Sequence, residues 1–323
     1  MTNLTHSGAG KPVQLSIVIP AFNEEDSLPA LFDRLNALLP RLEGVACDVL
    51  FVDDRSTDAT PAMLRQYCAS LPGRRWIRLA RNSGSHVAVL AGLERSSGEC
   101  AVFLAADLQD PPELIARMVE AWRGGARVVW AAREKREGIP WIDRAFAAGF
   151  WSLFNRIARV SLPPQGSDFC LLDRQAIRAL SQSVSEHPFI IGDIARLGFR
   201  QATVLYTKEA RRFGRSKWNL GRKLKAFADA VVSFSYLPLR LMSYLGLGLS
   251  ALGFLYAILV ALRAWLVDIP AQGWSSLMIV VLVIGGVQMT MLGVLGEYLW
   301  RTLEAAKKRP LYFVEEDSEN PPN

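Results

Sequence analysis

The first half of the chain repeats one pattern: a short apolar segment, a polar turn and a helix with one hydrophobic face. In the first predicted helix, Leu28, Leu31, Leu35 and Leu38 are spaced to lie on one side. The predicted strands are residues 14–20, 47–52, 76–80, 101–105 and 128–132. Strands that alternate with helices form βαβ units, in which helices cover a parallel sheet. The repeat therefore predicts an α/β fold with a mainly parallel sheet.

Polar residues directly follow four of these predicted strands. They are Asn23 and Glu24, then Asp53 and Asp54, then Asn82 and Gly84, and finally Asp107 and Gln109. The carboxyl ends of parallel strands meet at one edge of an open sheet, which is where such folds bind ligands. Asp and Asn also favour turns for local reasons, so any one pair fits a solvated loop as well. Four loops with the same chemistry favour a binding site.

The segment Val102–Glu113 carries the most specific of these loops. An apolar strand runs into a single carboxylate, Asp107, two residues before Gln109, and a Pro-Pro pair then opens a helix. A carboxylate and an amide oxygen beside a helix N-terminus suit a hard cation that carries phosphate oxygens. The segment therefore predicts a site for a metal-bound diphosphate, with a simple strand, turn and capped helix as the alternative.

Composition narrows the class of protein. Half of the residues are hydrophobic, which is a high share for a soluble protein, so part of the chain is expected to lie in lipid. Four widely spaced cysteines and three histidines argue against a zinc cluster or a disulfide framework. No GxGxxG follows the first strand, which disfavours a dehydrogenase. The N-terminus has no apolar signal-peptide core, so the first domain is expected in the cytosol.

Two segments near the C-terminus, Leu241–Leu262 and Ser275–Gly296, contain no charged residue. Each has 22 residues, and at ~1.5 Å per residue it would extend roughly 33 Å, enough for a hydrocarbon core of about 30 Å. The loop Asp268–Trp274 between them lacks Lys and Arg, whereas basic residues flank both outer ends. We therefore predict a two-helix transmembrane hairpin within residues 237–300, with both chain termini in the cytosol.

Positive charge is concentrated between Arg200 and Lys225, where nine basic residues accompany one acidic residue. Residues 211–236 are predicted as a basic juxtamembrane loop and amphipathic helix, with a solvated basic helix as the alternative. Residues 139–160 predict a second amphipathic helix, which lies either in the membrane interface or against its own domain. The formal charge of +6 is thus expected to favour binding to a membrane surface, and not to nucleic acid.

Four ordered motifs carry a family resemblance. They are Ile19–Glu25 (IPAFNEE), Val52–Ser56 (VDDRS), Ala106–Glu113 (ADLQDPPE) and Phe213–Trp218 (FGRSKW). Together they resemble the family 2 glycosyltransferases, and within them the bacterial polyprenyl-phosphate glycosyltransferases. That group includes O-antigen-modifying undecaprenyl-phosphate glucosyltransferases and aminoarabinose-transferring relatives, with dolichyl-phosphate mannose synthases more distant. The likeness implies a Rossmann-like GT-A domain at residues 14–210. The residues before it, 1–13, are expected to form a flexible arm, and residues 301–323 a cytosolic tail.

The resemblance implies an inverting enzyme that moves a sugar from a nucleotide sugar to undecaprenyl or another polyprenyl phosphate. A UDP-sugar such as UDP-glucose is the expected donor, and Mg²⁺ or Mn²⁺ is the expected cofactor. The expected place is the cytosolic leaflet of the bacterial inner membrane, as a homotetramer, in a pathway that modifies cell-envelope glycan or lipopolysaccharide. The alternatives are a catalytically silent membrane subunit and a processive polysaccharide synthase, whose QxxRW-like motif is not visible.

The resemblance also implies roles for individual residues. The nucleotide sugar would contact Pro20, Phe22, Asn23, Glu24, Asp53, Asp54, Gly84 and Asp107. Asp107 and Gln109 would bind the metal, and Asp168 matches an aspartate proposed as the catalytic base. The donor and acceptor phosphates would contact Arg133, Arg136, Arg211, Arg212, Ser216 and Lys217. Ala105 replaces the first carboxylate of the usual Asp-x-Asp, but Mg²⁺ is commonly held by one or two carboxylates, so activity is expected.

Overall fold

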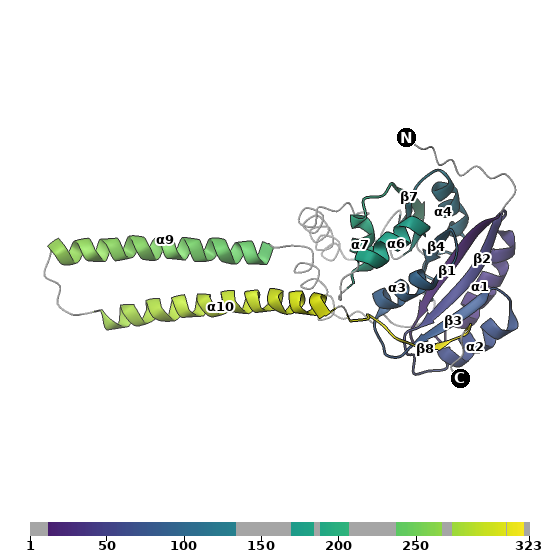
Figure 1. Cartoon of the computed structure of the whole chain (residues 1–323), viewed down its shortest axis with the longest axis horizontal. Helices are drawn as coiled ribbons and strands as arrows, with labels where there is room; N and C mark the ends of the chain where they lie inside the picture. The colour runs from purple at the N-terminus through teal and green to yellow at the C-terminus, as the bar shows by residue number, and fades with distance from the viewer. Residues whose placement is uncertain are drawn as a thin grey trace. The chain divides into compact units, whose positions relative to one another are not determined.

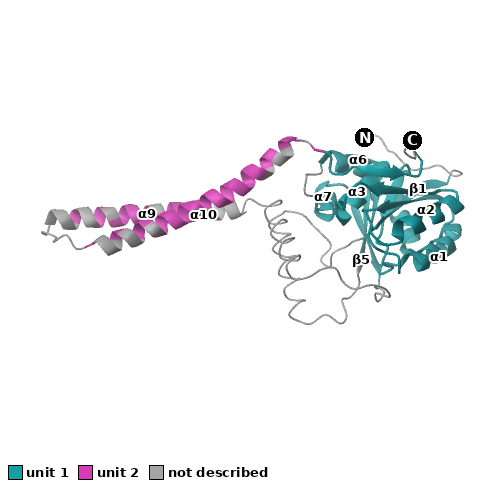
Figure 2. Cartoon of the chain, turned by 90° about the horizontal axis from the view of Figure 1, so that it is seen from below, with its two compact units in different colours: residues 1–217, 310–323 teal, residues 218–309 magenta. Residues whose placement is uncertain are grey.

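The computed structural model describes residues 12–133, 169–183, 188–206, 237–266, 273–307 and 309–319. The chain divides into two compact units, of which the first comprises Met1–Lys217 and Pro310–Asn323 and the second Trp218–Arg309 (Figure 2). The predicted interface helix at 139–160 and the basic segment at 211–236 lie outside the described residues.

A single eight-stranded sheet forms the centre of the first unit, in the order β7-β5-β6-β4-β1-β2-β3-β8 (Figure 1). The strands are β1 (Val13–Ala21), β2 (Val45–Asp53), β3 (Arg74–Leu79), β4 (Cys100–Phe103), β5 (Val128–Arg133), β6 (Cys170–Asp173), β7 (Gln201–Tyr206) and β8 (Val314–Asp317). Parallel pairing joins β4, β1, β2 and β3, as the alternating pattern predicts, and also joins β5 to β7. Strands β6 and β8 run antiparallel to their neighbours, so the sheet is mixed.

Helices cover both faces of this sheet. One face packs against α1 (Leu28–Leu38), α2 (Thr60–Ser70) and α4 (Leu114–Arg123), and a short 3₁₀ turn, η1 (Leu39–Arg41), follows α1. The four leucines predicted to share one side of α1 are all buried there. The other face packs against α3 (Ser85–Arg95), which has α6 (Arg174–Ser183) and α7 (Ile190–Arg196) beside it. Side chains on alternate faces of each strand thus fill two apolar layers.

Strand β6 lies between β4 and β5 and runs antiparallel to both of them. As a result β4 and β5 point in the same direction, and Arg133 at the end of β5 lies at the same sheet edge as the ends of β1, β2, β3 and β4. The described sheet therefore gathers the ends of five strands at one edge.

The C-terminal segment returns to the first unit. Strand β8 pairs antiparallel with β3, with Ile77 opposite Asp317 and Arg78 opposite Glu316. The sequence predicted only a tail in this region, because Val-Glu-Glu-Asp has a low intrinsic preference for strand structure. The edge of β3 and the arginines along it supply the partners that the local sequence does not reveal.

The second unit contains two long helices, α9 (Leu237–Leu266) and α10 (Trp274–Lys307), which include the two uncharged segments. Large apolar side chains such as Leu247, Phe254 and Met289 are more than two-thirds exposed. Among the residues that the structure describes, no helix combines the length and hydropathy needed to cross a bilayer. The two transmembrane spans therefore stay a prediction.

Candidate functional site

The strand order reverses between β1 and β4. Strands β2 and β3 follow β1 on one side, whereas β4 pairs with β1 on the other side, with Val18 opposite Phe103. In open α/β sheets the crevice at the carboxyl side of such a reversal is the usual ligand site. The loops that leave β1 and β4 at this point contain Asn23 and Asp107, two of the residues predicted from the sequence.

Hydrogen bonds join the loop after β1 to the loop after β2. The backbone N–H of Asn23 donates to the hydroxyl of Ser56 at 3.0 Å, and the side-chain oxygen of Asn23 accepts the N–H of Thr57 at 2.8 Å. The N–H of Glu24 donates to the hydroxyl of Thr60 at 2.9 Å. The sequence-predicted Asn23 and Glu24 are therefore held against the second acidic loop.

Asp54 extends the network to the loop after β3. Its buried carboxylate accepts the backbone N–H groups of Ser83 and Gly84 at 2.7 and 2.8 Å. Burial raises the pKa of Asp54, and these two hydrogen bonds oppose that shift. Hydrogen bonds thus connect three of the four predicted polar loops, those after β1, β2 and β3.

Asp53, at the end of β2, is fully buried and has two differently placed carboxylate oxygens. Oδ1 accepts the backbone N–H of Ser56 at 3.0 Å. Oδ2 lies 3.3 Å from Nε of Arg78, and both of these buried atoms lack a hydrogen-bond partner among the described residues. Burial raises the pKa of Asp53, while the hydrogen bonds from Ser56 and the charge of Arg78 lower it. Asp53 is therefore a carboxylate with unused hydrogen-bonding capacity at the sheet edge.

Each of these four loops contains a residue with positive φ. Asn23, Arg55 and Leu108 have φ values of 53°, 62° and 57°, and Gly84 has a φ of 91°. A non-glycine residue in this region is uncommon and costs energy, so it persists only where surrounding contacts hold it. Left-handed turns therefore recur at the carboxyl edge, where they redirect the chain after each strand.

Asp107 and Gln109 lie together in the loop after β4. Both are partly exposed, and the carboxylate of Asp107 accepts the backbone N–H of Gln109 at 3.2 Å. No group of three or more His, Cys, Asp or Glu side chains within the described ranges could hold a metal ion. A single carboxylate beside an amide oxygen nevertheless fits a hard cation whose other ligands are substrate phosphates and water. The donor set therefore fits a cation that arrives with a diphosphate.

A buried pair supports this loop from β7, the strand at one end of the sheet. The hydroxyl of Tyr206, at the end of β7, donates a hydrogen bond to the carboxylate of Asp110. Both residues are at most 5% exposed. Because Asp110 follows Gln109 directly, the contact restrains the position of the predicted metal loop.

The remaining sequence-predicted residues divide into two groups. Pro20 is the last residue but one of β1, Phe22 starts the loop after the strand, and both are half-buried at the same edge as Asp53. Arg133 ends β5 at that edge as well. The others lie outside the described residues: Arg136, Asp168, Arg211, Arg212, Ser216 and Lys217.

Several residues of the network were not among the predicted site residues, and Ser56 and Arg78 are two of them. Ser56 stands inside the VDDRS motif, and it links Asn23 to Asp53. Arg78 lies within β3, where its Nη2 donates to the carbonyl oxygen of Ser56 at 3.1 Å. An arginine between Ile77 and Leu79 in a predicted strand was the available signal, since such a charge requires partners.

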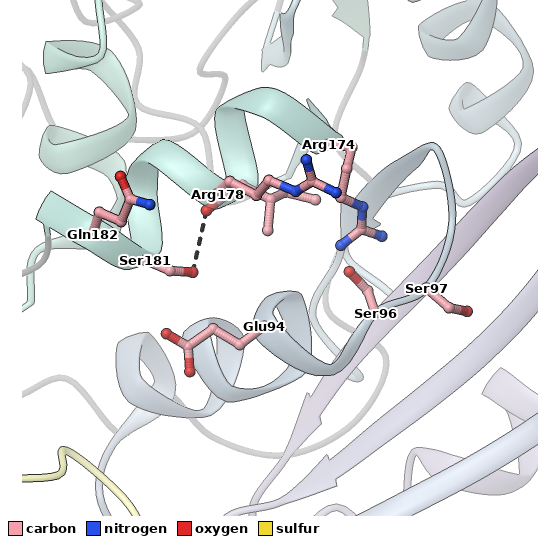
Figure 3. Close-up of a pocket in the computed structure, with 8 residues that line it drawn as sticks. Glu94, Ser96, Ser97, Arg174, Arg178, Ser181 and Gln182 are labelled. Atoms are coloured by element: carbon pink, nitrogen blue, oxygen red, sulfur yellow. Dashed lines mark hydrogen bonds between the residues drawn. The ribbon is translucent and has the colours of Figure 1, made fainter.

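A cavity of about 520 Å³ lies elsewhere in the first unit (Figure 3). It is lined by Glu94, Ser96 and Ser97 at the end of α3 and by Arg174, Arg178 and Ser181 of α6. The segment containing Ser96 and Ser97 leads into the amino end of β4, so this cavity lies at the edge opposite Asp107. None of the sequence-predicted site residues that the structure describes lines it.

Comparison with known proteins identifies related sequences over nearly the whole chain. Residues 16–180 match the family described as Glycosyl transferase family 2, and residues 237–301 match the GtrB C-terminal hairpin. An uncharacterized glycosyltransferase of Synechocystis sp. is 39% identical over 302 residues, which cover 94% of this chain and 95% of that protein. The bactoprenol glucosyl transferase of Shigella phage SfV is 30% identical over 307 residues, which cover 95% and 100% of the two chains.

Solved structures show the same fold at lower sequence identity. The UDP complex of glucosyl-3-phosphoglycerate synthase from Mycobacterium tuberculosis aligns with a TM-score of 0.51 and 18% identity. The alignment covers 69% of this chain and 79% of that one. The first unit therefore has a GT-A, Rossmann-like α/β fold with a mixed, mostly parallel sheet.

Proposed function

The chain belongs to glycosyltransferase family 2, and on this premise we propose that it transfers a sugar from a nucleotide sugar to a polyprenyl phosphate. One observation carries the proposal: a single chain matches both the family 2 domain, at residues 16–180, and the GtrB hairpin, at residues 237–301. The name of the phage relative, bactoprenol glucosyl transferase, supports a lipid acceptor and a glucosyl donor. UDP-glucose or a related UDP-sugar is the proposed donor.

The donor would lie along the carboxyl edge of the sheet. Asp53 ends β2 and Asp107 follows β4, so two strand spacings separate their strands, or about 10 Å. A nucleoside at Asp53 would therefore extend its diphosphate toward Asp107. Pro20, Phe22, Asn23, Glu24, Asp54 and Gly84 would complete the nucleotide site, because they line the same connected loops.

Asp107 and Gln109 would hold Mg²⁺ or Mn²⁺ through a carboxylate and an amide oxygen. When bound, such a cation neutralises charge on the departing nucleoside diphosphate. The adjacent helix α4 directs its N-terminus toward this loop and adds a favourable field for phosphate. The position of Asp107 beside the strand reversal supports this assignment.

The acceptor chemistry follows from the charge of a phosphate monoester. A phosphate oxygen of the lipid would attack the anomeric carbon from the face opposite the diphosphate, which leaves with the electrons of the broken carbon–oxygen bond. The anomeric configuration would invert. Because the second pKa of a phosphate monoester is about 6, the nucleophile is already largely deprotonated at neutral pH. We therefore assign Asp168 the role of orienting the acceptor or a basic residue, and not of removing a proton.

Two negatively charged phosphates must approach each other in this reaction. Arg211, Arg212, Ser216 and Lys217 would supply the opposing charge and hydrogen bonds, with Arg133 and Arg136 contributing from the end of β5 and the residues after it. Uncharged segments that begin soon after this cluster would keep the lipid acceptor nearby. The proposed location is the cytosolic leaflet of the bacterial inner membrane, supported by the exposed apolar side chains of α9 and α10.

A second candidate is a catalytically silent relative, which the alanine at position 105 favours. Ala105 stands where a second carboxylate ligand is usual, and a weaker metal site would follow from its absence. Asp107, Gln109 and the connected nucleotide loops are nevertheless all present, which supports an active enzyme.

The proposal is tested with purified full-length protein, undecaprenyl phosphate, Mg²⁺ or Mn²⁺ and a panel of UDP- and GDP-sugars. Mass spectrometry should identify a lipid carrying one added sugar, together with released nucleoside diphosphate. Replacement of Arg212 by Gln should raise the KM for lipid phosphate more than it weakens binding of free nucleotide. Absence of product with every donor would favour the silent subunit, and a polymer would indicate a processive synthase.

A further inference from the structure

The loop after β4 alternates between buried and partly exposed residues. Ala106, Leu108 and Asp110 are at most 5% exposed, whereas the candidate metal ligands Asp107 and Gln109 are partly exposed. The buried residues therefore hold the loop against the first unit, and the partly exposed ones are those that a cation could reach. Of the three buried residues, Asp110 alone has an ionisable side chain, and burial of such a group requires hydrogen-bond donors beside it.

Strand β7 supplies a donor for Asp110. The hydroxyl of Tyr206, a residue that is 5% exposed, donates to the carboxylate of Asp110. The same strand is tied to α4, the helix after the loop, because Nη1 of Arg117 donates to the carbonyl oxygen of Leu205 at 3.2 Å. The last two residues of β7 thus hold both the metal loop and the helix that follows it.

The same strand end borders the basic residues assigned to the acceptor. Strand β7 pairs in parallel with β5, and Tyr206 stands opposite Arg133 in the register of the two strands. Tyr206 is also the last residue of β7, and Arg211 is the fifth residue after it in the sequence. The position of Tyr206 therefore sets where the segment with the predicted acceptor residues starts. One residue thus touches the metal loop and adjoins the basic residues.

We propose that Tyr206 is a positioning residue that fixes the metal loop, through Asp110, relative to the basic residues that would bind the acceptor phosphate. The inference rests on the proposed function, because it assumes a cation at Asp107 and Gln109 and a lipid phosphate at the basic residues. Groups that orient metal ligands without touching the metal commonly affect metal affinity and activity. Without the hydroxyl, a buried carboxylate has one donor fewer, so the loop would shift toward another donor or water. The metal site and its distance from the acceptor would then both change.

Replacement of Tyr206 by Phe tests this role, because it removes the hydroxyl and keeps the buried ring. Tyr67→Phe is the matched control, since Tyr67 of α2 is 8% exposed and its hydroxyl donates to Oδ1 of Asn36 in α1 at 2.8 Å. Sugar transfer by full-length protein is measured across a Mn²⁺ titration and across an undecaprenyl phosphate titration, with the nucleotide sugar that the wild type uses. We expect Tyr206→Phe to raise both the Mn²⁺ activation constant and the KM for the lipid at least about threefold. Tyr67→Phe should change neither constant.

A second background separates positioning from general destabilisation. Neither constant depends on how much of a preparation is folded, so a partly unfolded variant still reports on the site. In Asp110→Asn protein the hydroxyl faces a neutral amide, and Tyr206→Phe should raise the two constants by a smaller factor than in the wild type. An unchanged constant in Tyr206→Phe, an equal rise in Tyr67→Phe, or an undiminished factor in Asp110→Asn would overturn the inference and leave the proposed function intact. If wild-type protein transfers no sugar from any donor, the proposed function is wrong, and the inference fails with it.

Discussion

The carboxylate of Asp54 accepts the backbone N–H of Gly84 at 2.8 Å, which joins the loop after β2 to the residue that caps α3. The other oxygen of Asp54 accepts the N–H of Ser83. Gly84 has a φ of 91°, so its amide points toward the carboxylate from a turn that few other residues adopt. Asp54 therefore supports the site by fixing neighbouring backbone, and a change there should affect folding as well as donor binding.

Replacement of Asp54 by Asn should lower the free energy of unfolding by about 1–3 kcal/mol. The amide can accept only one of the two backbone N–H groups and presents its own N–H to the other. Urea denaturation measures the change. Asp33→Asn, on the exposed side of α1, is the matched control and should stay within about 0.5 kcal/mol of the wild type. An equal change in the free energy of unfolding at both positions would contradict the stabilising role of the Asp54 hydrogen bonds.

Replacement of Asp107 by Ala should abolish metal-dependent sugar transfer, with a loss of at least about 100-fold in kcat. The reason is that Asp107 is the carboxylate placed to hold the cation at the strand reversal. The transfer assay is run across a Mn²⁺ titration. The Ala105→Asp variant restores the second carboxylate for comparison. Wild-type protein, which has Ala105, should be active without that carboxylate. Substantial transfer by Asp107→Ala would contradict this metal assignment.

Replacement of Asp168 by Asn should reduce kcat by a similar factor at about pH 6 and about pH 8.5, because the acceptor phosphate needs no strong base. The pH profile of kcat measures this. A variant that is inactive at the lower pH and recovers at the higher pH would establish Asp168 as the general base instead.

Replacement of Gly92 by Ala should destabilise the first unit by about 1–3 kcal/mol. A Cβ at this position would lie 2.2 Å from Cγ1 of Val18 and 3.0 Å from Cγ2 of Val52, so α3 would have to move off the sheet. Thermal or urea unfolding measures the loss. Val18→Ala removes the closer methyl group, and the Gly92→Ala/Val18→Ala double variant should lose less than the sum of the two single changes. A double variant that loses the full sum of the two single losses in stability would contradict this explanation.

The stability of the protein should fall as pH rises through the titration of Asp193. Burial raises the pKa of this carboxyl to about 6, with a smaller opposing effect from Arg196. The folded state therefore holds the proton more tightly than the unfolded state, so the stabilising contribution is fully present below the ordinary value of 3.8 and is lost as pH rises toward about 6. Its size is on the order of 3 kcal/mol. Unfolding of Asp193→Asn should show a flatter pH dependence between these values, and an unchanged profile would contradict the assignment.

Local sequence was sufficient to predict the parallel part of the sheet. The strands β1 to β5 lie close to the predicted segments, and α1 buries the leucines that its spacing placed on one side. Apolar periodicity reports which side of an element is buried, and that information is present in each short window. The polar loops after four strands were predicted for the same reason, because parallel strands must end at a common edge.

Pairings between distant segments could not be predicted in this way. Strand β6 enters the sheet between β4 and β5, and β8 reaches the edge of β3 from more than 200 residues away. Neither strand's own sequence specifies a partner, because hydrogen bonds in a sheet are made by backbone groups that every residue carries.

The residue types at the candidate site could therefore be predicted from the sequence, whereas tertiary contacts decided the burial and hydrogen bonding of each side chain. Asp53 and Asp54 look alike in VDDRS, but Asp54 uses both oxygens to hold the next loop, and Asp53 keeps one oxygen beside Arg78 without a hydrogen bond among the described residues. The difference arises because burial and partner geometry depend on where other strands bring their backbone and charges. Side-chain chemistry is encoded at each position, and its use depends on neighbours that only the folded chain supplies.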